Sequence, residues 1–175
     1  MVSTGGTIEK TYDELDGVLE NRMGALDGAP TGRTSVLDVL LDSLSLPHVA
    51  LDRVRLMDKD SLDMTEADHD LIAGTARELA ADHDGVVVVH GTDRLAVTGE
   101  RAAAGPPPAA PIVLTGAMLP WVVRSTDATQ NVTEALLASQ LLAPGVYVAM
   151  HGAVHAFPGV VKDRRRGTFV GRRRP

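Results

Sequence analysis

Two threonines, an aspartate and a lysine could together carry out nucleophilic chemistry with a hydroxyl group. Thr7 follows the pair Gly5-Gly6, and Thr92 is followed directly by Asp93. A threonine hydroxyl is a weak nucleophile until a base takes its proton, and a lysine with a lowered pKa can be that base. Lys162 is the candidate. Spacing leaves two alternatives open, because Thr92 and Asp93 could instead cap a helix and Lys162 could be an ordinary basic residue.

Other chemistries find less support in the sequence. His151 and His155 have a zinc spacing for a helix, but Gly152 and Pro158 argue against a helix there, and we expect no metal. The chain holds neither a glycine-rich phosphate motif nor a GxSxG elbow. It has no cysteine, which fits a reducing compartment and predicts a cytoplasmic protein. We expect the remaining histidines to divide into one buried residue, His90, and three at the surface, His48, His69 and His83.

Charge is unevenly distributed along the chain. Residues 162–175 carry seven Lys and Arg against one Asp, whereas residues 1–161 carry 10 Lys and Arg against 22 Asp and Glu. A basic end could contact nucleic acid, but five aromatic residues make no stacking platform, so we expect no nucleic-acid partner. No apolar run approaches the ~20 residues of a membrane span, and the N-terminus lacks the features of an export signal. We therefore expect neither a membrane partner nor export.

Strands alternate with helices along these 175 residues, which fit one domain. Leucines at helical spacing predict a first helix that Thr34 caps and Pro47 follows, and Thr65 with Asp68 forms a capping box for a second. Four valines, residues 86–89, are typical of a strand covered on both faces. The pattern predicts further strands at 48–57, 112–118 and 145–152 and helices at 94–104 and 127–142. This alternation predicts a parallel sheet with helices on both faces.

In such a sheet, ligands bind beyond the carboxyl ends of the strands, so the residues that follow each strand are the informative ones. They are Thr4 to Thr7, Asp60-Ser61, His90 to Asp93, Thr115 to Met118 and His151-Gly152. The polar, glycine-containing segment 9–32 is predicted to be a mobile loop. Tyr12 lies in that loop, where its phenol could swing over the site and bond a threonine hydroxyl.

Taken in order, the segments TGGTIEKTYD, DSLDMT, VVVVHGTDRL, VLTGAMLP, STDATQN and GVVKD resemble the bacterial L-asparaginase family, in its short single-domain branch without the C-terminal domain. The resemblance covers nearly the whole chain. It implies an α/β fold, a three-layer flavodoxin-like and mostly parallel sheet with helices on both faces, over residues 1–161, with a lid at about 9–32. Residues 162–175 would hold the catalytic lysine and a basic tail. It also implies a homodimer or homotetramer.

The resemblance implies hydrolysis of L-asparagine to L-aspartate and ammonia through a threonine acyl-enzyme, without a cofactor. The family's nucleophile falls on Thr7, and the tyrosine that orients or activates it falls on Tyr12. The family's second triad of threonine, aspartate and lysine falls on Thr92, Asp93 and Lys162. An amide is a poor electrophile, so an aligned hydroxyl, a proton acceptor and donors to the oxyanion are all required.

The substrate contacts that the resemblance implies involve four residues of this chain. Ser61 would hold the α-carboxylate, and Thr92 and Asp93 would line the site, with Asp93 meeting the α-ammonium. The backbone at Ala117 would approach the substrate amide. Alternative functions are a glutaminase or the ammonia-producing part of an amidotransferase on the same scaffold, since one methylene changes binding by only about 1–3 kcal/mol. A silent amino-acid-binding protein is another.

Three features of the chain depart from the family pattern. Only Met1 to Ser3 precede the TGGTI segment, so the first strand is expected to be short and to support Thr7 poorly. Arg94 follows HGTD where the family has threonine, and Leu119 follows GAM where it has arginine. We expect Arg94 and Leu119 to affect stability or assembly and to spare the substrate contacts.

Overall fold

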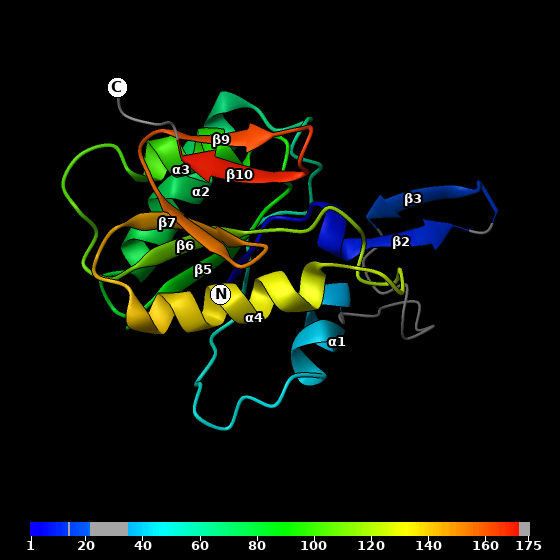
Figure 1. Cartoon of the computed structure of the whole chain (residues 1–175), viewed down its shortest axis with the longest axis horizontal. Coiled ribbons are helices and arrows are strands. Elements are labelled where there is room, and N and C mark those ends of the chain that lie inside the picture. Colours follow the sequence, from blue (N-terminus) through cyan, green and yellow to red (C-terminus); the bar gives the residue numbers. More distant parts are fainter. Residues whose placement is uncertain (14, 22–34, 172–175) are drawn as a thin grey trace.

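The computed structural model describes residues 1–13, 15–21 and 35–171. Its centre is a six-stranded sheet in the order β4-β1-β5-β6-β7-β8 (Figure 1). The first five of these strands run parallel and the edge strand β8 runs antiparallel to β7. The strands are β1 (Val2–Ser3), β4 (Val54–Arg55), β5 (Val86–Val89), β6 (Ile112–Thr115), β7 (Val146–Met150) and β8 (Ala153–Ala156).

The strand order reverses between β1 and β5. Strand β4 lies on one side of β1, and β5, β6 and β7 follow in sequence on the other side. This is the flavodoxin-like order, in which ligands bind outside the strand ends at the point of reversal. The two strands at that point are followed by the segments 4–7 and 90–93. The predicted fold class is confirmed, and the topology selects two of the five candidate segments.

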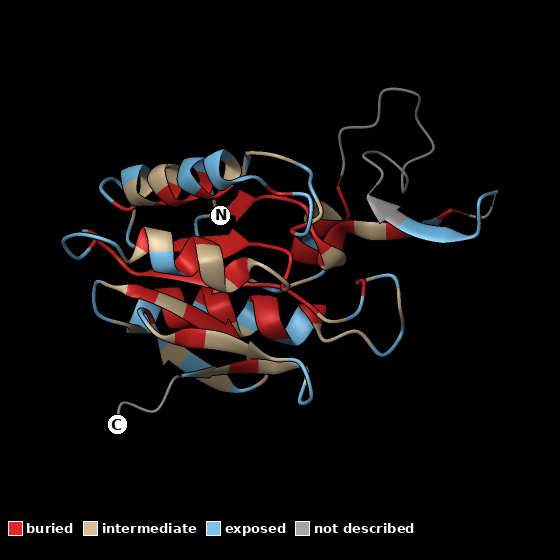
Figure 2. Ribbon diagram, turned by 90° about the horizontal axis from the view of Figure 1, so that it is seen from above, coloured by how far each residue is buried: buried red, intermediate tan, exposed pale blue. Residues whose placement is uncertain are grey.

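Helices cover both faces of the sheet (Figure 1). Val86 and Val88 belong to one core cluster, with α2 and α3, whereas Val87 and Val89 belong to another, with α1 and α4. All four valines are at most 3% exposed, and the central strands of the sheet are coloured as buried in Figure 2. The prediction of a strand covered on both faces is confirmed. The helices are α1 (Val36–Asp42), α2 (Glu66–Leu79), α3 (Leu95–Ala102) and α4 (Ala128–Leu141).

Capping boxes start two of the helices. The Thr65 side chain accepts from the Asp68 N–H, and the Asp68 carboxylate accepts from the Thr65 N–H, as predicted for α2. Ser35 and Asp38 form the same box at α1, so Ser35 is the N-cap. The residue expected to be that cap, Thr34, lies outside the described residues. Of the strand predicted at 48–57, only two residues form β4. No helix in the described part of the chain is long and apolar enough to cross a bilayer.

Two hairpins were not anticipated. Strands β2 (Lys10–Asp13) and β3 (Val18–Asn21) pair and extend from the body (Figure 1), where a loop without regular structure was expected. Residues 22–32 of that expected loop lie outside the described residues. Strands β9 (Val160–Asp163) and β10 (Thr168–Gly171) pair beside α3, with Val160 and Phe169 buried in the core. The expected division at residue 162 therefore falls inside β9, and Lys162 lies on an anchored strand.

Candidate active site

The loops after β1, β4, β5 and β6 meet through glycine contacts. A Cβ on Gly6 would lie 2.6 Å from the backbone N of Gly91, and a Cβ on Gly91 would lie 2.7 Å from Ser61 Oγ. A Cβ on Gly116 would lie 2.3 Å from the carbonyl O of His90. Only glycine allows these approaches, because any side chain would separate the loops. The contacts bring three further predicted residues to the same edge of the sheet, namely Thr7, Thr92 and Ala117.

The short first strand is held firmly. The backbone N–H and the hydroxyl of Thr4 both donate to the carbonyl of Val89, at 3.1 and 2.9 Å. Gly5 and Gly6 then both adopt a φ of 89°, which turns the chain toward Thr7. Ser3 donates to the buried carboxyl of Glu9, and burial raises the pKa of Glu9. The doubt that the short strand raised about the support of Thr7 is therefore not borne out.

Lys162 reaches the threonine and aspartate that the sequence paired with it. Its Nζ donates to Thr92 Oγ1 at 2.8 Å and to Asp93 Oδ1 at 3.1 Å. Thr92 is buried, and the side chain of Lys162 is 13% exposed. Arg164 adds a contact that sequence reasoning missed, because its Nη1 lies 2.8 Å from the same Asp93 oxygen. The Asp93 carboxylate therefore contacts two basic side chains.

Tyr12 does not join the other predicted residues in this structure. It lies on β2, is 62% exposed, and its hydroxyl lies beside Gly17 at the tip of the hairpin. A salt bridge of 2.6 Å between Lys10 and Asp60 fixes the base of the hairpin to the loop after β4, and this bond lowers the pKa of Asp60. The predicted contact between the phenol and a threonine is thus absent from this arrangement of the described residues.

Arg94 contacts the end of the loop after β4 and the start of α2. Its guanidinium donates to the carbonyl of Met64 at 2.7 Å and to the carboxylate of Glu66 at 3.1 Å, at the start of α2. Leu119 is 40% exposed, and its backbone N–H donates to Asp127. Both departures from the family pattern leave the residues that converge at the strand ends untouched.

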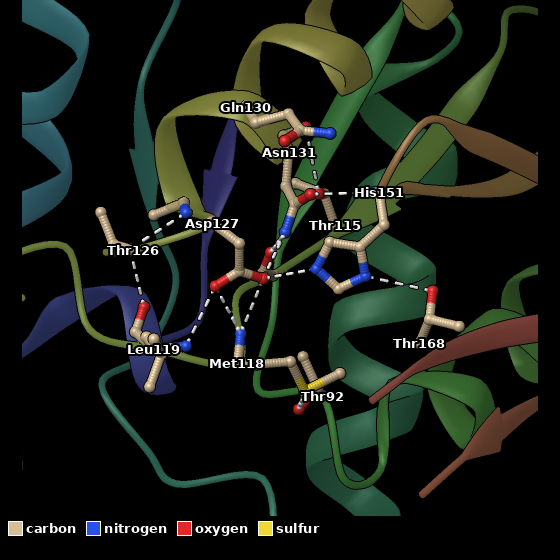
Figure 3. Close-up of polar contacts among 12 residues, drawn as sticks. Thr92, Thr115, Met118, Leu119, Thr126, Asp127, Gln130, Asn131, His151 and Thr168 are labelled. Carbon is tan, nitrogen blue, oxygen red and sulfur yellow. Dashed lines mark hydrogen bonds and ion pairs between the residues drawn. The ribbon is translucent and has the colours of Figure 1, made fainter. Parts of the chain in front are cut away.

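The segment that contains Ala117 is clamped by Asp127 and Asn131 at the start of α4, as Figure 3 shows. The Asp127 carboxylate accepts the N–H groups of Met118 and Leu119, each at 3.0 Å, and Asn131 Nδ2 donates to the carbonyl of Gly116 at 2.9 Å. Burial alone would raise the pKa of Asp127, but these backbone bonds and His151 outweigh it and lower that pKa. Sequence reasoning had given Asp127 only a helix start. The spacing of Asp and Asn four residues apart was the available signal.

A buried pair of histidines supports the turn before Thr92. His90 Nδ1 lies 2.7 Å from the carbonyl of Gly91 and so carries the proton, which leaves Nε2 to accept from Thr98 Oγ1 at 2.8 Å. Thr98 in turn accepts from His69 Nδ1 at 2.7 Å, and the two rings stack. The prediction that His90 is buried is confirmed. The prediction that His69 lies at the surface is wrong, since it is fully buried.

Acid should weaken the fold through these two histidines. Burial lowers the pKa of both, that of His90 to about 4, below the ordinary value of 6.5. Between pH 6.5 and 4 the unfolded chain therefore binds more protons than the folded chain. The free energy of unfolding has its full value above pH 6.5 and decreases as the pH falls across that window. His90 should contribute a loss on the order of 3 kcal/mol. Urea unfolding at pH 7, 6, 5 and 4.5 measures it, and His90→Asn should flatten the dependence; an equal slope in both proteins would contradict the assignment.

His151 and His155 are not on a helix, as expected. His151 lies in the turn after β7 with a φ of 55°, and His155 lies on β8. Among the residues that the structure describes, no group of three or more His, Asp or Glu side chains could hold a metal ion.

The family description "Asparaginase, N-terminal" matches residues 1–168, nearly the whole chain. The chain belongs to the asparaginase family. An L-asparaginase from Thermococcus kodakarensis is 36% identical over 97 residues, 54% of this chain and 29% of that protein. The solved structure of the thermostable L-asparaginase from that organism superposes with a TM-score of 0.80 at 28% identity, covering 99% of this chain and 51% of that one.

A second kind of relative carries a different name. It is a component of the glutamyl-tRNA(Gln) amidotransferase of Haloquadratum walsbyi, and it is 33% identical over 155 residues, which is 87% of this chain and 33% of that protein. The chain thus spans about a third of these curated relatives and about half of the solved asparaginase. Membership of the asparaginase family therefore leaves the substrate to be assigned.

Proposed function

We propose that this chain hydrolyses L-asparagine to L-aspartate and ammonia through a threonine acyl-enzyme. The observation that carries the proposal is the position of Lys162 Nζ, 2.8 Å from Thr92 Oγ1, at the point where the strand order reverses. A largely buried amine next to a hydroxyl is the arrangement that proton transfer to or from that hydroxyl requires. Thr7 would approach the same place, because it follows Gly6 and Gly6 lies against Gly91.

In the proposed reaction, Thr7 Oγ1 attacks the side-chain amide carbon and forms an ester. The C–N bond breaks as the nitrogen gains the proton that the Thr7 hydroxyl has lost, and the nitrogen leaves as ammonia. Water then attacks the ester, which releases aspartate and restores the Thr7 hydroxyl. Lys162, as the neutral amine, would take the Thr92 proton so that Thr92 can activate the water. Tyr12 would act on Thr7 after the β2–β3 hairpin moves over the loops. Backbone donors at Ala117 would face the developing oxyanion.

Substrate binding would use the groups that the glycine contacts bring together. Ser61 is 1% exposed and lies against Gly91, where its hydroxyl would hold the α-carboxylate. Asp93 would accept the α-ammonium, because its carboxylate is negatively charged and its side chain is 28% exposed. The same carboxylate contacts Lys162, which places the ammonium beside the proposed base. Residues 1–161 with the β9–β10 hairpin would form this unit. A second copy, in a homodimer or homotetramer, would complete it.

A second candidate is the ammonia-supplying component of an amidotransferase. It is favoured by the similarity to a component of a glutamyl-tRNA(Gln) amidotransferase, which extends over 87% of the chain. In that case the same threonine chemistry would act on an amide whose ammonia is passed to a partner protein. The two candidates share the residues named above and differ in substrate and partner.

Ammonia release from L-asparagine and from L-glutamine, measured side by side, tests the proposal. Turnover of asparagine well above that of glutamine supports an asparaginase, and the reverse favours the second candidate. If well-folded protein releases ammonia from neither amide but binds aspartate tightly in calorimetry, the silent binding protein is the correct interpretation.

Arg164 should compete with the substrate's ammonium group for Asp93. Its guanidinium lies 2.8 Å from Asp93 Oδ1, but its side chain is 71% exposed, so the pair is weak. Arg164→Gln should therefore tighten the binding of L-aspartate by about two- to fivefold and leave succinate, which has no ammonium, unchanged. Calorimetry of both ligands measures this. Arg165→Gln removes the same charge one residue away and should change neither; equal aspartate affinity in all three proteins would exclude the competition.

A further inference from the structure

His151 has a backbone conformation that the surrounding structure imposes. Its φ of 55° is uncommon for a residue with a β-carbon. The backbone N–H donates to Asn131 Oδ1 at 3.0 Å, which holds the residue in place. Such a conformation persists when the contacts of the residue require it, so the place of the imidazole is informative.

The imidazole bridges two side chains, as Figure 3 shows. Its Nε2 lies 2.7 Å from Asp127 Oδ2, and its Nδ1 lies 3.1 Å from Thr168 Oγ1. An ionised carboxylate only accepts, so Nε2 carries a proton. In the neutral ring, Nδ1 then accepts from the Thr168 hydroxyl. Two hydrogen bonds therefore run in one direction, from the Thr168 hydroxyl to the imidazole and from the imidazole to the Asp127 carboxylate.

The two residues at the ends of this hydrogen-bonded series, Asp127 and Thr168, belong to two parts of the candidate site. These parts are the Ala117 segment and the β9–β10 hairpin. Asp127 holds the backbone of Met118, the residue after Ala117, and the sulfur of Met118 lies 3.7 Å from Thr92 Oγ1. Thr168 lies on β10, whose next residue, Phe169, is directly opposite Lys162 in the β9–β10 ladder. His151 therefore ties the Ala117 segment to the hairpin that carries Lys162.

We propose that His151 is a positioning residue that sets Lys162 in register with Thr92 and the Ala117 segment, which rests on the proposed function. Burial of Val160 and Phe169 attaches the β9–β10 hairpin to the body. Apolar contacts have little direction, whereas the two bonds of the imidazole fix one orientation. A cleft of about 700 Å³, lined by Asp127, His151, Arg166 and Thr168 among others, runs beside the ring and leaves this side of the hairpin otherwise open.

His151→Asn tests the proposal, because asparagine tolerates a positive φ but its short amide cannot bridge both partners. Thr168→Val removes only the hydroxyl. Each should lower kcat for the better amide by about 10- to 100-fold, the cost of a misplacement near 1 Å, and change KM by less than about threefold. Thr168→Ser keeps the hydroxyl, and His155→Asn changes another histidine of the cleft; both should match the parent. Thermal unfolding reports the folded fraction, so kcat is compared per folded molecule.

The ammonium resonance of Lys162 gives a second readout that needs no turnover. The chain has three lysines, Lys10, Lys59 and Lys162, so labelled-lysine spectra assign readily. The Lys162 signal should shift in His151→Asn and Thr168→Val and stay in place in Thr168→Ser and His155→Asn. An unchanged signal, or equal kcat in all four variants, overturns the proposal. If the parent protein turns over no amide, the proposed function fails, and the Lys162 signal still decides whether His151 positions that lysine.

Discussion

Replacing Lys162 by methionine should lower kcat for amide hydrolysis by about 10²- to 10⁴-fold, the usual contribution of a positioned acid or base. Methionine is unbranched and nearly as long, so it fills the space but leaves Thr92 and Asp93 without the contacts at 2.8 and 3.1 Å. Ammonia release under saturating substrate measures the change. Binding of aspartate should change less, because Asp93 keeps its negative charge.

Lys59→Met is the matched control for this prediction. Lys59 lies in the loop after β4, but its ammonium group forms an exposed salt bridge of 2.8 Å with Asp68 of α2. Its replacement should leave kcat within about twofold of the parent, since exposed pairs contribute little. Turnover near that of the parent in Lys162→Met, with the fold intact by circular dichroism, would remove Lys162 from the proposed chemistry.

Gly6→Ala should destabilise the fold by roughly 2–6 kcal/mol and abolish turnover in the folded remainder. With φ 89° and ψ −168°, Gly6 occupies a region that residues with a β-carbon avoid at a cost of about 1–3 kcal/mol. Its Cβ would also lie 2.6 Å from the backbone of Gly91, and forced overpacking adds about 1–3 kcal/mol. Relief of that overlap would move the Thr7 turn away from Thr92. Urea unfolding measures the stability.

Two other glycines separate the cost of the backbone conformation from the cost of the steric overlap. Gly105 has a φ of 91° but open space around it, so Gly105→Ala should show the backbone cost without the overlap. Gly74 lies within α2 with nothing within 4 Å of its Cβ, and Gly74→Ala should stabilise the protein by about 0.5–1 kcal/mol. A Gly6→Ala protein no less stable than Gly105→Ala would show that the contact with Gly91 does not constrain the loops.

The sequence by itself determined the elements whose signals are local. The four valines of β5 and the capping box of Thr65 and Asp68 required only neighbouring residues to be interpreted, and both occur as predicted. The alternation of strands and helices was enough for the fold class. The position of Thr92 and Asp93 after a buried strand made them candidates, because parallel strands place their carboxyl ends on one edge. Only the resemblance to the asparaginase family favoured catalysis over a helix cap.

The tertiary structure decided whatever depends on contacts between distant residues. Whether Lys162 reaches Thr92, 70 positions earlier, depends on how β9 packs, and no local signal encodes that. For the same reason the sequence misplaced His69, whose partners are Thr98 and a stacked ring. The two hydrogen bonds of His151, to Asp127 and to Thr168, join three segments that are far apart in the chain. Chain entropy makes such pairings costly to form, so only the summed burial of the whole fold fixes them.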